Sequence, residues 1–265
     1  MPATSTRPSV LLWDVDGTLA ETERDGHRVA FNQAFADAGL PWSWDVARYG
    51  ELLRVTGGRE RLLLDMQSRG DVPAAPGERE ALARRLHARK NEFYADLVTG
   101  GAIALREGVV ELMQECLERG VRMGVVTTTS RSNLDALLRV HLGPRWAESF
   151  AVLVCGEDVS RKKPDPEAYQ RALRALGVGP LAAVALEDSP GGVAAARAAD
   201  VPVVVTRSAY FAEATIEGAI AIGPGLHRRP GWRPEIEAAG GDGGRVGLDD
   251  IVEWCAQMDS VSQFA

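Results

Sequence analysis

Residues 10–18 read VLLWDVDGT, a short apolar run followed at once by two closely spaced aspartates. The run Val10–Trp13 predicts a strand buried on both faces, because such strands are continuously apolar. Side chains alternate along an extended chain, so we expect Asp14 and Asp16 to point the same way. Two carboxylates this close repel each other unless a cation lies between them, and hard oxygen ligands favour Mg²⁺. An acidic turn, with Gly17 supplying the turn conformation, is the alternative interpretation.

Beyond Gly100-Gly101, the sequence alternates between strand-like and helix-like segments. Strands buried on both faces and joined by crossover helices form parallel sheets, so we predict an α/β fold with a doubly wound, Rossmann-like sheet. The first strand has no such partner nearby in the sequence, and we assign it to the same sheet. The predicted later strands are Val121–Val126, Ala151–Cys155, Ala183–Leu186 and Val201–Val205, and the helices are Val109–Arg119, Ser132–Leu142, Asp165–Leu176 and Gly191–Ala199.

The residues between the first strand and Gly100 are instead almost wholly helical in pattern. We predict that residues 20–105 form a small all-helical domain inserted into an α/β core made of residues 1–19 and 106–265. A first helix places His27, Phe31, Phe35 and Ala38 near helical spacing. Further helices are predicted at Trp42–Val55, Arg59–Met66 and Glu78–Val98, an exposed loop at Gly223–Arg245 and a last helix at Leu248–Gln257.

The composition predicts a globular protein whose surface as a whole does not bind polyanions. The 265 residues are 45% hydrophobic and 25% charged, which excludes global disorder. Thirty Lys and Arg against 37 Asp and Glu leave a net charge of −7, which argues against nucleic-acid and anionic-membrane binding. The distant cysteines Cys116, Cys155 and Cys255 suit reduced thiols, and no apolar run reaches the roughly 20 residues of a membrane span. We therefore expect a cytoplasmic monomer that binds neither nucleic acid nor membranes.

Polar residues follow the predicted strands at their carboxyl ends, where doubly wound sheets bind ligands. The segment Thr127-Thr128-Thr129-Ser130 follows the second strand, Lys163-Pro164 follows the third, and Glu187-Asp188-Ser189 follows the fourth. Taken singly, these segments also suit helix caps or a solvated basic loop. Taken together with Asp14 and Asp16, these segments contribute more carboxylates than the single ammonium of Lys163 can neutralise. A site here that accepted a phosphate dianion would therefore require a divalent cation.

The four motifs, in this order, resemble those of the haloacid-dehalogenase-like superfamily of Mg²⁺-dependent phosphohydrolases, and the helical block resembles that family's small cap domain. The resemblance implies that Asp14 is the nucleophile that forms an aspartyl-phosphate, and that Asp16 is the acid and base for leaving group and water. Thr127 and Lys163 would orient and neutralise the phosphoryl oxygens. The metal residues that the resemblance implies are Asp14, the carbonyl of Asp16 and Asp188, with Glu187 in support.

The helical block, which we call the cap (residues 20–105), is similar to that of CbbY-type proteins, which are sugar-phosphate phosphatases characterised with xylulose-1,5-bisphosphate. The matching segments are LAETE at 19–23, His27, AFN at 30–32 and TGGRER at 56–61. Gly57-Gly58 would free backbone N–H groups at a helix start, and Arg59 would add a guanidinium suited to phosphate. The substrate-binding residues that the resemblance implies are Glu23, His27, Tyr49, Arg54, Gly58, Arg59 and Thr128.

Two departures from the family pattern concern the connections between cap and core. Glu107-Gly108 stands where Pro-Gly is usual, at the return to the core. His27 lies one residue further from Asp14 than the resemblance predicts.

The resemblance implies a Mg²⁺-dependent phosphatase whose partner is a small phosphorylated sugar, with one phosphate of a bisphosphate cleaved and the other anchored by the cap. A phosphosugar mutase such as β-phosphoglucomutase shares all four core motifs and stays open as an alternative. Phosphoglycolate phosphatase is another, and a phosphate-sensing module without turnover is the non-enzymatic one.

Overall fold

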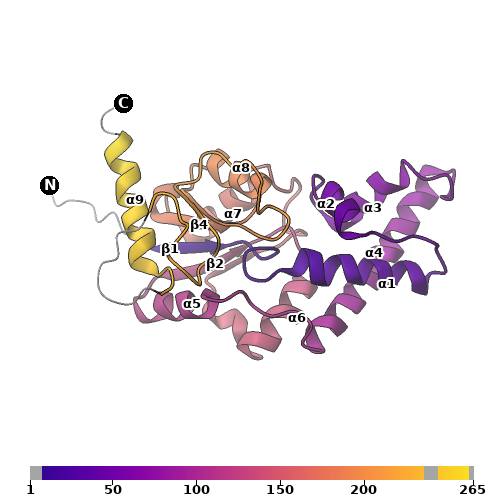
Figure 1. The fold of residues 1–265 in the computed structure, drawn as a ribbon, viewed down its shortest axis with the longest axis horizontal. Coiled ribbons are helices and arrows are strands. Elements are labelled where there is room, and N and C mark those ends of the chain that lie inside the picture. Colours follow the sequence, from indigo (N-terminus) through magenta and orange to yellow (C-terminus); the bar gives the residue numbers. More distant parts are fainter. Residues whose placement is uncertain (1–7, 236–243, 263–265) are drawn as a thin grey trace.

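The computed structural model describes residues 8–235 and 244–262. Within these ranges, six parallel strands form one sheet in the order β3-β2-β1-β4-β5-β6 (Figure 1). The first strand of the chain is central, with β2 on one side and β4 on the other. This confirms the predicted doubly wound α/β fold. The strands are β1 (Val10–Trp13), β2 (Arg122–Val126), β3 (Val152–Val154), β4 (Ala183–Glu187), β5 (Val203–Thr206) and β6 (Ala221–Gly223).

Helices cover both faces of the sheet, and alternation along β1 feeds two separate apolar cores. Leu11 and Trp13 belong to the cluster that contains residues of α5, α6 and α9. Val10 and Leu12 belong to the cluster with residues of α7 and α8. The helices are α5 (Val109–Glu118), α6 (Arg131–Leu142), α7 (Glu167–Leu176), α8 (Pro190–Ala198) and α9 (Leu248–Ser262), with short 3-10 turns η2 (Trp146–Ser149) and η3 (Pro180–Ala182).

The segment between β1 and α5 forms a group of helices beside the carboxyl ends of the strands (Figure 1). It has its own apolar cluster, built around Phe31, Phe35, Trp44 and Leu62. Helix α4 also packs against α6, which ties this group to the sheet-bearing part. Its elements are the π-helix η1 (Glu23–His27), α1 (Arg28–Asp37), α2 (Val46–Leu52), α3 (Gly58–Met66) and α4 (Pro76–Thr99).

The helix predicted at Trp42–Val55 is shorter in the structure, and the prediction is wrong for its first residues. Helix α2 starts only at Val46, where the carboxylate of Asp45 accepts from the backbone N–H of Arg48 at 2.7 Å. Trp42 and Trp44 precede this N-cap and are buried in the cap cluster. Burial of the two indoles therefore explains the apolar residues that were assigned to a helix.

The exposed loop predicted at Gly223–Arg245 is confirmed in part, since most residues of 227–235 are exposed, but other described residues of this segment are buried. Gly223 ends strand β6, and Leu226 and Trp232 are buried. The ring of Trp232 stacks on that of Trp254 in α9 with 4.7 Å between centroids. Few apolar residues among many Gly, Pro and Arg gave no periodic signal, although these few hold the segment to the core. Residues 236–243 lie outside the described residues.

The π-helix η1 explains how the extra residue before His27 is accommodated. A π-turn holds one more residue than an α-turn, so it absorbs an insertion while the following helix keeps its direction. Gly26 lies inside this turn, and a Cβ there would be only 2.5 Å from the side chain of Ile103. The turn thus brings His27 to the sheet edge, where its ring meets Asp16.

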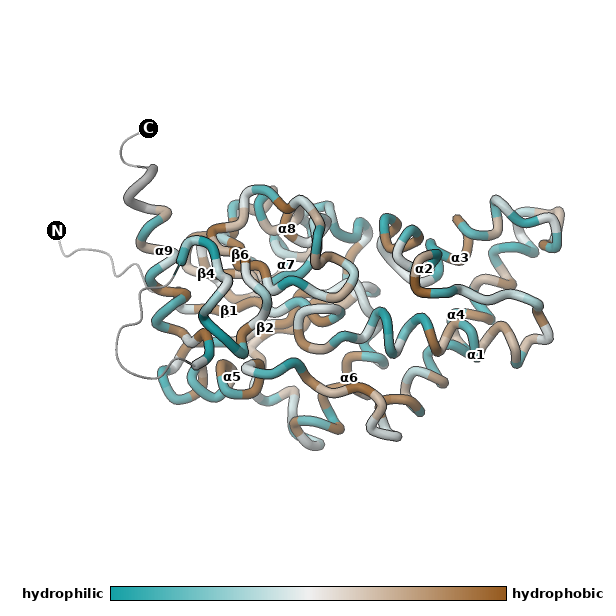
Figure 2. Tube along the Cα trace, in the orientation of Figure 1, coloured by the Kyte–Doolittle hydropathy of each residue, from teal (hydrophilic) through white to brown (hydrophobic). Residues whose placement is uncertain are grey.

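Apolar residues concentrate along the strands and on the inward sides of the helices (Figure 2). In the part of the chain that the structure describes, no helix combines the length and the apolar character that crossing a membrane requires.

Candidate active site

Lys163 lies at the centre of the groups that follow the strands. Its ammonium donates to Asp14 Oδ1 at 2.7 Å, to Glu187 Oε1 at 2.6 Å and to the carbonyl of Val126 at 2.8 Å. Asp14 directly follows β1, and Glu187 and Val126 end β4 and β2, so one side chain connects the ends of three neighbouring strands. Although burial opposes it, the charges of Asp14 and Glu187 raise the pKa of Lys163, which therefore stays protonated at neutral pH.

Three buried carboxylates surround one small space beside this lysine. Ligand oxygens of Asp14, Glu187 and Asp188 all lie within 4.8 Å of one another. Burial, together with the charge of Glu187, raises the pKa of Asp14 to about 8 even though Lys163 opposes the shift. Burial and the charge of Asp14 likewise raise the pKa of Asp188 well above its usual range. Lys163 alone therefore does not neutralise the three carboxylates. A group of hard oxygen ligands of this kind fits Mg²⁺.

Two glycines give these carboxylates their room. A Cβ on Gly17, whose φ is +90°, would lie 2.1 Å from Asp188 Oδ2. A Cβ on Gly192, near the start of α8, would lie 1.8 Å from Glu187 Oε2. That oxygen is buried and has no hydrogen-bond partner among the described residues, whereas Oε1 accepts from Tyr169 at 2.5 Å. A buried carboxylate oxygen without a donor is a further sign of missing positive charge.

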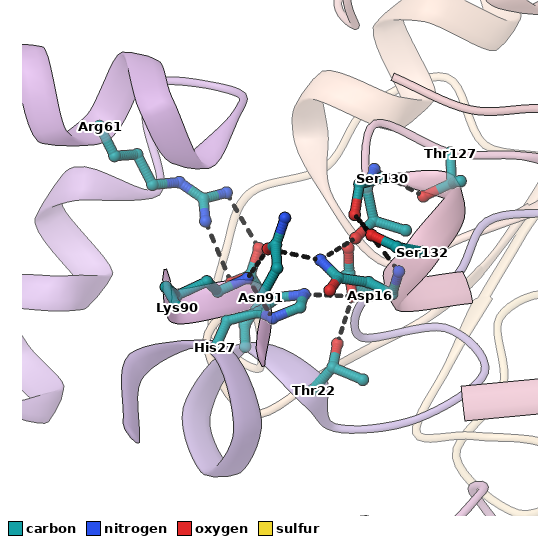
Figure 3. A network of polar contacts seen from close by, with 12 residues as sticks. Asp16, Thr22, His27, Arg61, Lys90, Asn91, Thr127, Ser130 and Ser132 are labelled. Carbon is teal, nitrogen blue, oxygen red and sulfur yellow. Dashed lines mark hydrogen bonds and ion pairs between the residues drawn. The ribbon is translucent and has the colours of Figure 1, made fainter. Parts of the chain in front are cut away.

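A second polar chain begins at Asp16 and runs into the cap (Figure 3). Asp16 Oδ1 accepts a hydrogen bond from the hydroxyl of Thr22 at 2.6 Å and lies 2.9 Å from His27 Nε2. His27 Nδ1 lies 2.8 Å from the ammonium of Lys90 on α4. A lysine ammonium can only donate, so Nδ1 accepts and the proton on Nε2 is directed at Asp16.

The titration of this chain follows from its partners. Burial opposes it, yet the nearby imidazole of His27 and the hydrogen bonds from His27 and Thr22 hold the pKa of Asp16 below its usual range. Burial lowers the pKa of Lys90 to about 8, although the charges of Asp16 and Glu23 oppose that shift. Asp14 and Asp16 therefore stand in opposite environments, although only one residue separates them.

Between the sheet edge and the cap lies a cavity of about 390 Å³. On its cap side, Arg61 and Glu23 form an ion pair at 2.9 Å. The hydroxyl of Tyr49 donates to Glu23 and accepts from Arg61. Lys162, next to the central lysine, reaches Glu60 of the cap at 2.7 Å. The lining includes Asp16, Glu23, His27, Gly58, Arg59, Arg61, His87, Lys90, Thr128, Ser130, Asn133 and Lys162.

The structure brings most of the predicted site residues together, but not all of them. Glu23, His27, Gly58, Arg59 and Thr128 line the cavity. Thr127 is buried behind it, and its hydroxyl accepts from the backbone N–H of Thr129 at 3.1 Å. Tyr49 is buried and does not line the cavity, but its hydroxyl contacts two residues that do, Glu23 and Arg61. Arg54 is exposed on the cap surface and does not line the cavity, because α2 ends at Leu52 and the chain turns before α3.

Sequence reasoning missed several residues that the cap contributes to this cavity. Arg61 stands in the quoted TGGRER segment, yet only the structure shows that it is buried against Glu23. Lys90 had a usable signal, because it continues the apolar stripe of α4 that contains Leu82 and Leu86. A lysine on an apolar stripe is rarely buried without a partner. Other lining residues that the sequence did not single out include His87, Asn133, Glu157 and Lys162.

The comparisons with known proteins point in the same direction. Residues 8–200 match the family model of haloacid dehalogenase-like hydrolases. The protein CbbY of Rhodobacter capsulatus is 42% identical over 200 residues, which cover 76% of this chain and 86% of that protein. A plasmid-encoded CbbY of Cupriavidus necator is 41% identical over 216 residues, which cover 82% of this chain and 85% of that protein.

One solved structure links this fold to a ligand. The crystal structure of a CbbY mutant from Rhodobacter sphaeroides, in complex with xylulose-1,5-bisphosphate, superposes with a TM-score of 0.75 and 42% identity. The match covers 80% of this chain and 92% of that one.

Proposed function

This chain belongs to the haloacid dehalogenase-like hydrolase family and is a phosphatase, and from that premise we propose that it hydrolyses a small sugar bisphosphate with Mg²⁺. The observation that carries this proposal is the polar cavity between sheet and cap, which Asp16 lines at the sheet edge and Arg59 and Arg61 line on the cap side. Lys163 and the three carboxylates lie at the same sheet edge, outside the set of residues that line the cavity. The likeness to a protein crystallised with xylulose-1,5-bisphosphate favours that substrate.

We propose that Asp14, the carbonyl of Asp16 and Asp188 hold the metal, with Glu187 in support through its contact with Lys163. When bound there, Mg²⁺ supplies positive charge against the phosphoryl oxygens and against the charge of Asp14. The remaining chemistry falls to the side chains of this chain.

In the first half of the reaction, an oxygen of Asp14 attacks the phosphorus. The bond from phosphorus to the sugar oxygen breaks as the new bond forms. The negative charge of the bound phosphate opposes the ionisation of Asp16, so this carboxyl takes up a proton when the substrate binds and gives it to the departing oxygen. Lys163 neutralises charge on the transferring group, while the hydroxyl of Thr127 helps to orient it. The products of this half are the free sugar hydroxyl and an aspartyl-phosphate on Asp14.

In the second half, Asp16 takes a proton from water and the water oxygen attacks the phosphorus. The bond between phosphorus and Asp14 breaks, which releases phosphate and restores the free carboxylate. Thr22 and His27 both bind Oδ1 of Asp16, so they fix the carboxyl group for its two roles. Since His27 belongs to the cap, the acid and base is correctly held only when the cap lies against the sheet.

We also propose the predicted division into a core of residues 1–19 and 106–265 and a cap domain of residues 20–105. In this division the core carries the phosphoryl chemistry. The cap binds the second phosphate at the start of α3, where Gly58 exposes backbone N–H groups and Arg59 adds charge.

The experiment that tests this proposal measures phosphate release from xylulose-1,5-bisphosphate and from matched sugar monophosphates, with Mg²⁺ and with EDTA. We expect kcat/KM for the bisphosphate to exceed that for the monophosphates by about 10-fold or more, because the second phosphate adds a charge-assisted contact. EDTA should abolish turnover. Full activity in EDTA, or an isomerised sugar phosphate in place of free phosphate, would contradict the proposal.

A further inference from the structure

We propose that Ser208 and Arg106 are positioning residues for the metal carboxylate Asp188, with Arg106 acting through the segment that carries Ser208. This inference rests on the metal-dependent phosphatase proposed above. Neither residue lies within a sequence motif of the site, and neither lines the cavity. Their role follows from how the Asp188 carboxylate is held.

Asp188 Oδ2 occupies a narrow slot with two walls. On one side is the backbone of Gly17, where an added Cβ would lie 2.1 Å from this oxygen. On the other side is Ser208, which is 5% exposed and whose hydroxyl donates to Oδ2 at 2.6 Å. The same added Cβ would lie 3.0 Å from Cβ of Ser208, so the two walls stand close enough to fix the carboxylate between them.

Arg106 binds both walls of this slot. Its guanidinium donates to the carbonyl of Gly17 on one side. On the other side it donates to the carbonyls of Thr206 at 3.1 Å and Arg207 at 2.7 Å, which directly precede Ser208. A further bond to the carbonyl of Pro224 at 3.2 Å anchors the group to the end of the sheet. A guanidinium offers five donors in a rigid plane, which lysine cannot reproduce.

The place of Arg106 in the chain connects this slot to the cap. Arg106 lies in the segment that returns from the cap, and its own N–H donates to the carbonyl of Leu19 at 2.8 Å. The slot segment also touches the outgoing connection, since the N–H of Ala209 lies 3.2 Å from the carboxylate of Glu21. Next to it, the ring of Tyr210 lies 5.9 Å from that of Tyr49 in the cap. The position of Asp188 therefore depends on both connections between cap and sheet.

The test measures metal binding directly rather than turnover. Mn²⁺ is titrated into the metal-free full-length protein, and the free ion is followed by electron paramagnetic resonance. The variants are Ser208→Ala, Arg106→Lys and their combination. Arg207→Lys is the matched control, because the Arg207 guanidinium also holds backbone carbonyls, those of Phe211, Ala212 and Ala214 at 2.8–2.9 Å, yet donates to neither Gly17 nor Ser208.

We expect Ser208→Ala and Arg106→Lys each to raise the Kd for Mn²⁺ by about 10-fold or more, as for other groups that orient metal ligands. The double variant should bind Mn²⁺ no more weakly than the single variant with the lower affinity, because both substitutions act on the carboxylate of Asp188. Arg207→Lys should bind Mn²⁺ as the native chain does. Thermal unfolding of each variant, followed by circular dichroism, separates this effect from a general loss of stability.

Unchanged Mn²⁺ affinity in Ser208→Ala would overturn the inference, and this variant decides the matter if Arg106→Lys does not fold. Strictly additive losses in the double variant would overturn the route from Arg106 through Ser208. A native chain that binds no Mn²⁺ would instead overturn the proposed metal site itself.

Discussion

The polar groups of the sheet edge and those of the cap are held in different ways. On the sheet side, Asp14 and Glu187 lie at or just beyond the ends of parallel strands, and hydrogen bonds of 2.6–2.7 Å join both to Lys163 in the loop before α7. On the cap side, His27, Arg61 and Lys90 come from three helical elements whose mutual placement depends on the packing of the cap. A sheet edge fixes its side chains through backbone register, whereas the cap fixes them through side-chain contacts. We therefore expect substitutions on the sheet side to abolish chemistry and those on the cap side to reduce it by degrees.

The largest effect is expected on the sheet side, from Asp14→Asn. The amide cannot act as the nucleophile, so kcat should fall by about 10⁴-fold or more in the phosphate-release assay. The fold should persist, because the substitution preserves the shape of the side chain. Residual activity within about ten-fold of the native value would show that Asp14 is not the nucleophile.

A smaller loss is expected from Lys90→Met on the cap side. Lys90 holds the His27 ring that binds Asp16, so its removal should lower kcat by about 10- to 100-fold while KM changes little. Arg89→Met is the matched control on the same helix, since Arg89 is paired with Asp37 and Glu92 away from the cavity. Equal kcat values for the two variants would break the proposed link from α4 to the acid and base.

A still smaller effect distinguishes two arginines of the cap. Arg59 lines the cavity and Arg54 does not, although both follow the family resemblance. Arg59→Met should raise KM for the bisphosphate by about 10-fold through the loss of a charge-assisted contact, with kcat nearly unchanged. Arg54→Met should leave both constants at the native values. The reverse result would place the second phosphate elsewhere on the cap.

The smallest effect concerns stability rather than turnover. Burial first, and the charge of Lys90 next, lower the pKa of His87 in the cap to about 4 from the usual 6.5. Between these two values the unfolded chain binds more protons than the folded one, so His87 makes stability fall as the pH falls.

Urea unfolding of the native chain and of His87→Gln should therefore diverge on acidification. From about pH 7 to about pH 5.5 the native chain should lose about 1 kcal/mol more than the variant. Parallel pH profiles for the two proteins would mean that His87 is not buried in neutral form.

The contrast between the two sides also explains how far the sequence could be interpreted. The strands and the residues that follow them were predictable, because a continuous apolar run ends at the sheet edge and the next polar residue then lies there. Glu23, His27 and Arg59 could be named only through a family resemblance, since helical periodicity says which face is buried but not what it meets. Lys90 and Arg61 show this limit most clearly. Each is a buried charged side chain that pairs with a residue of another helix, His27 for Lys90 and Glu23 for Arg61.

Errors outside the site have a related cause. Trp42 and Trp44 suggested a longer helix, and Trp232 lay in a segment predicted to be exposed, yet all three indoles are buried by contacts distant in sequence. The slot that holds Asp188 was missed for the same reason. Arg106 and Ser208 are 102 positions apart in the numbering, and only folding brings Arg106 to the carbonyl of Arg207, the residue before Ser208.

The most direct test of the central claim is to find the transferred phosphoryl group on the protein. Native enzyme turning over the sugar bisphosphate with Mg²⁺ is quenched in acid, digested and examined by mass spectrometry. We predict that the peptide containing Asp14 carries one phosphoryl group on that carboxylate. Rapid turnover with this peptide unmodified, and with the phosphoryl group on another residue, would contradict the account.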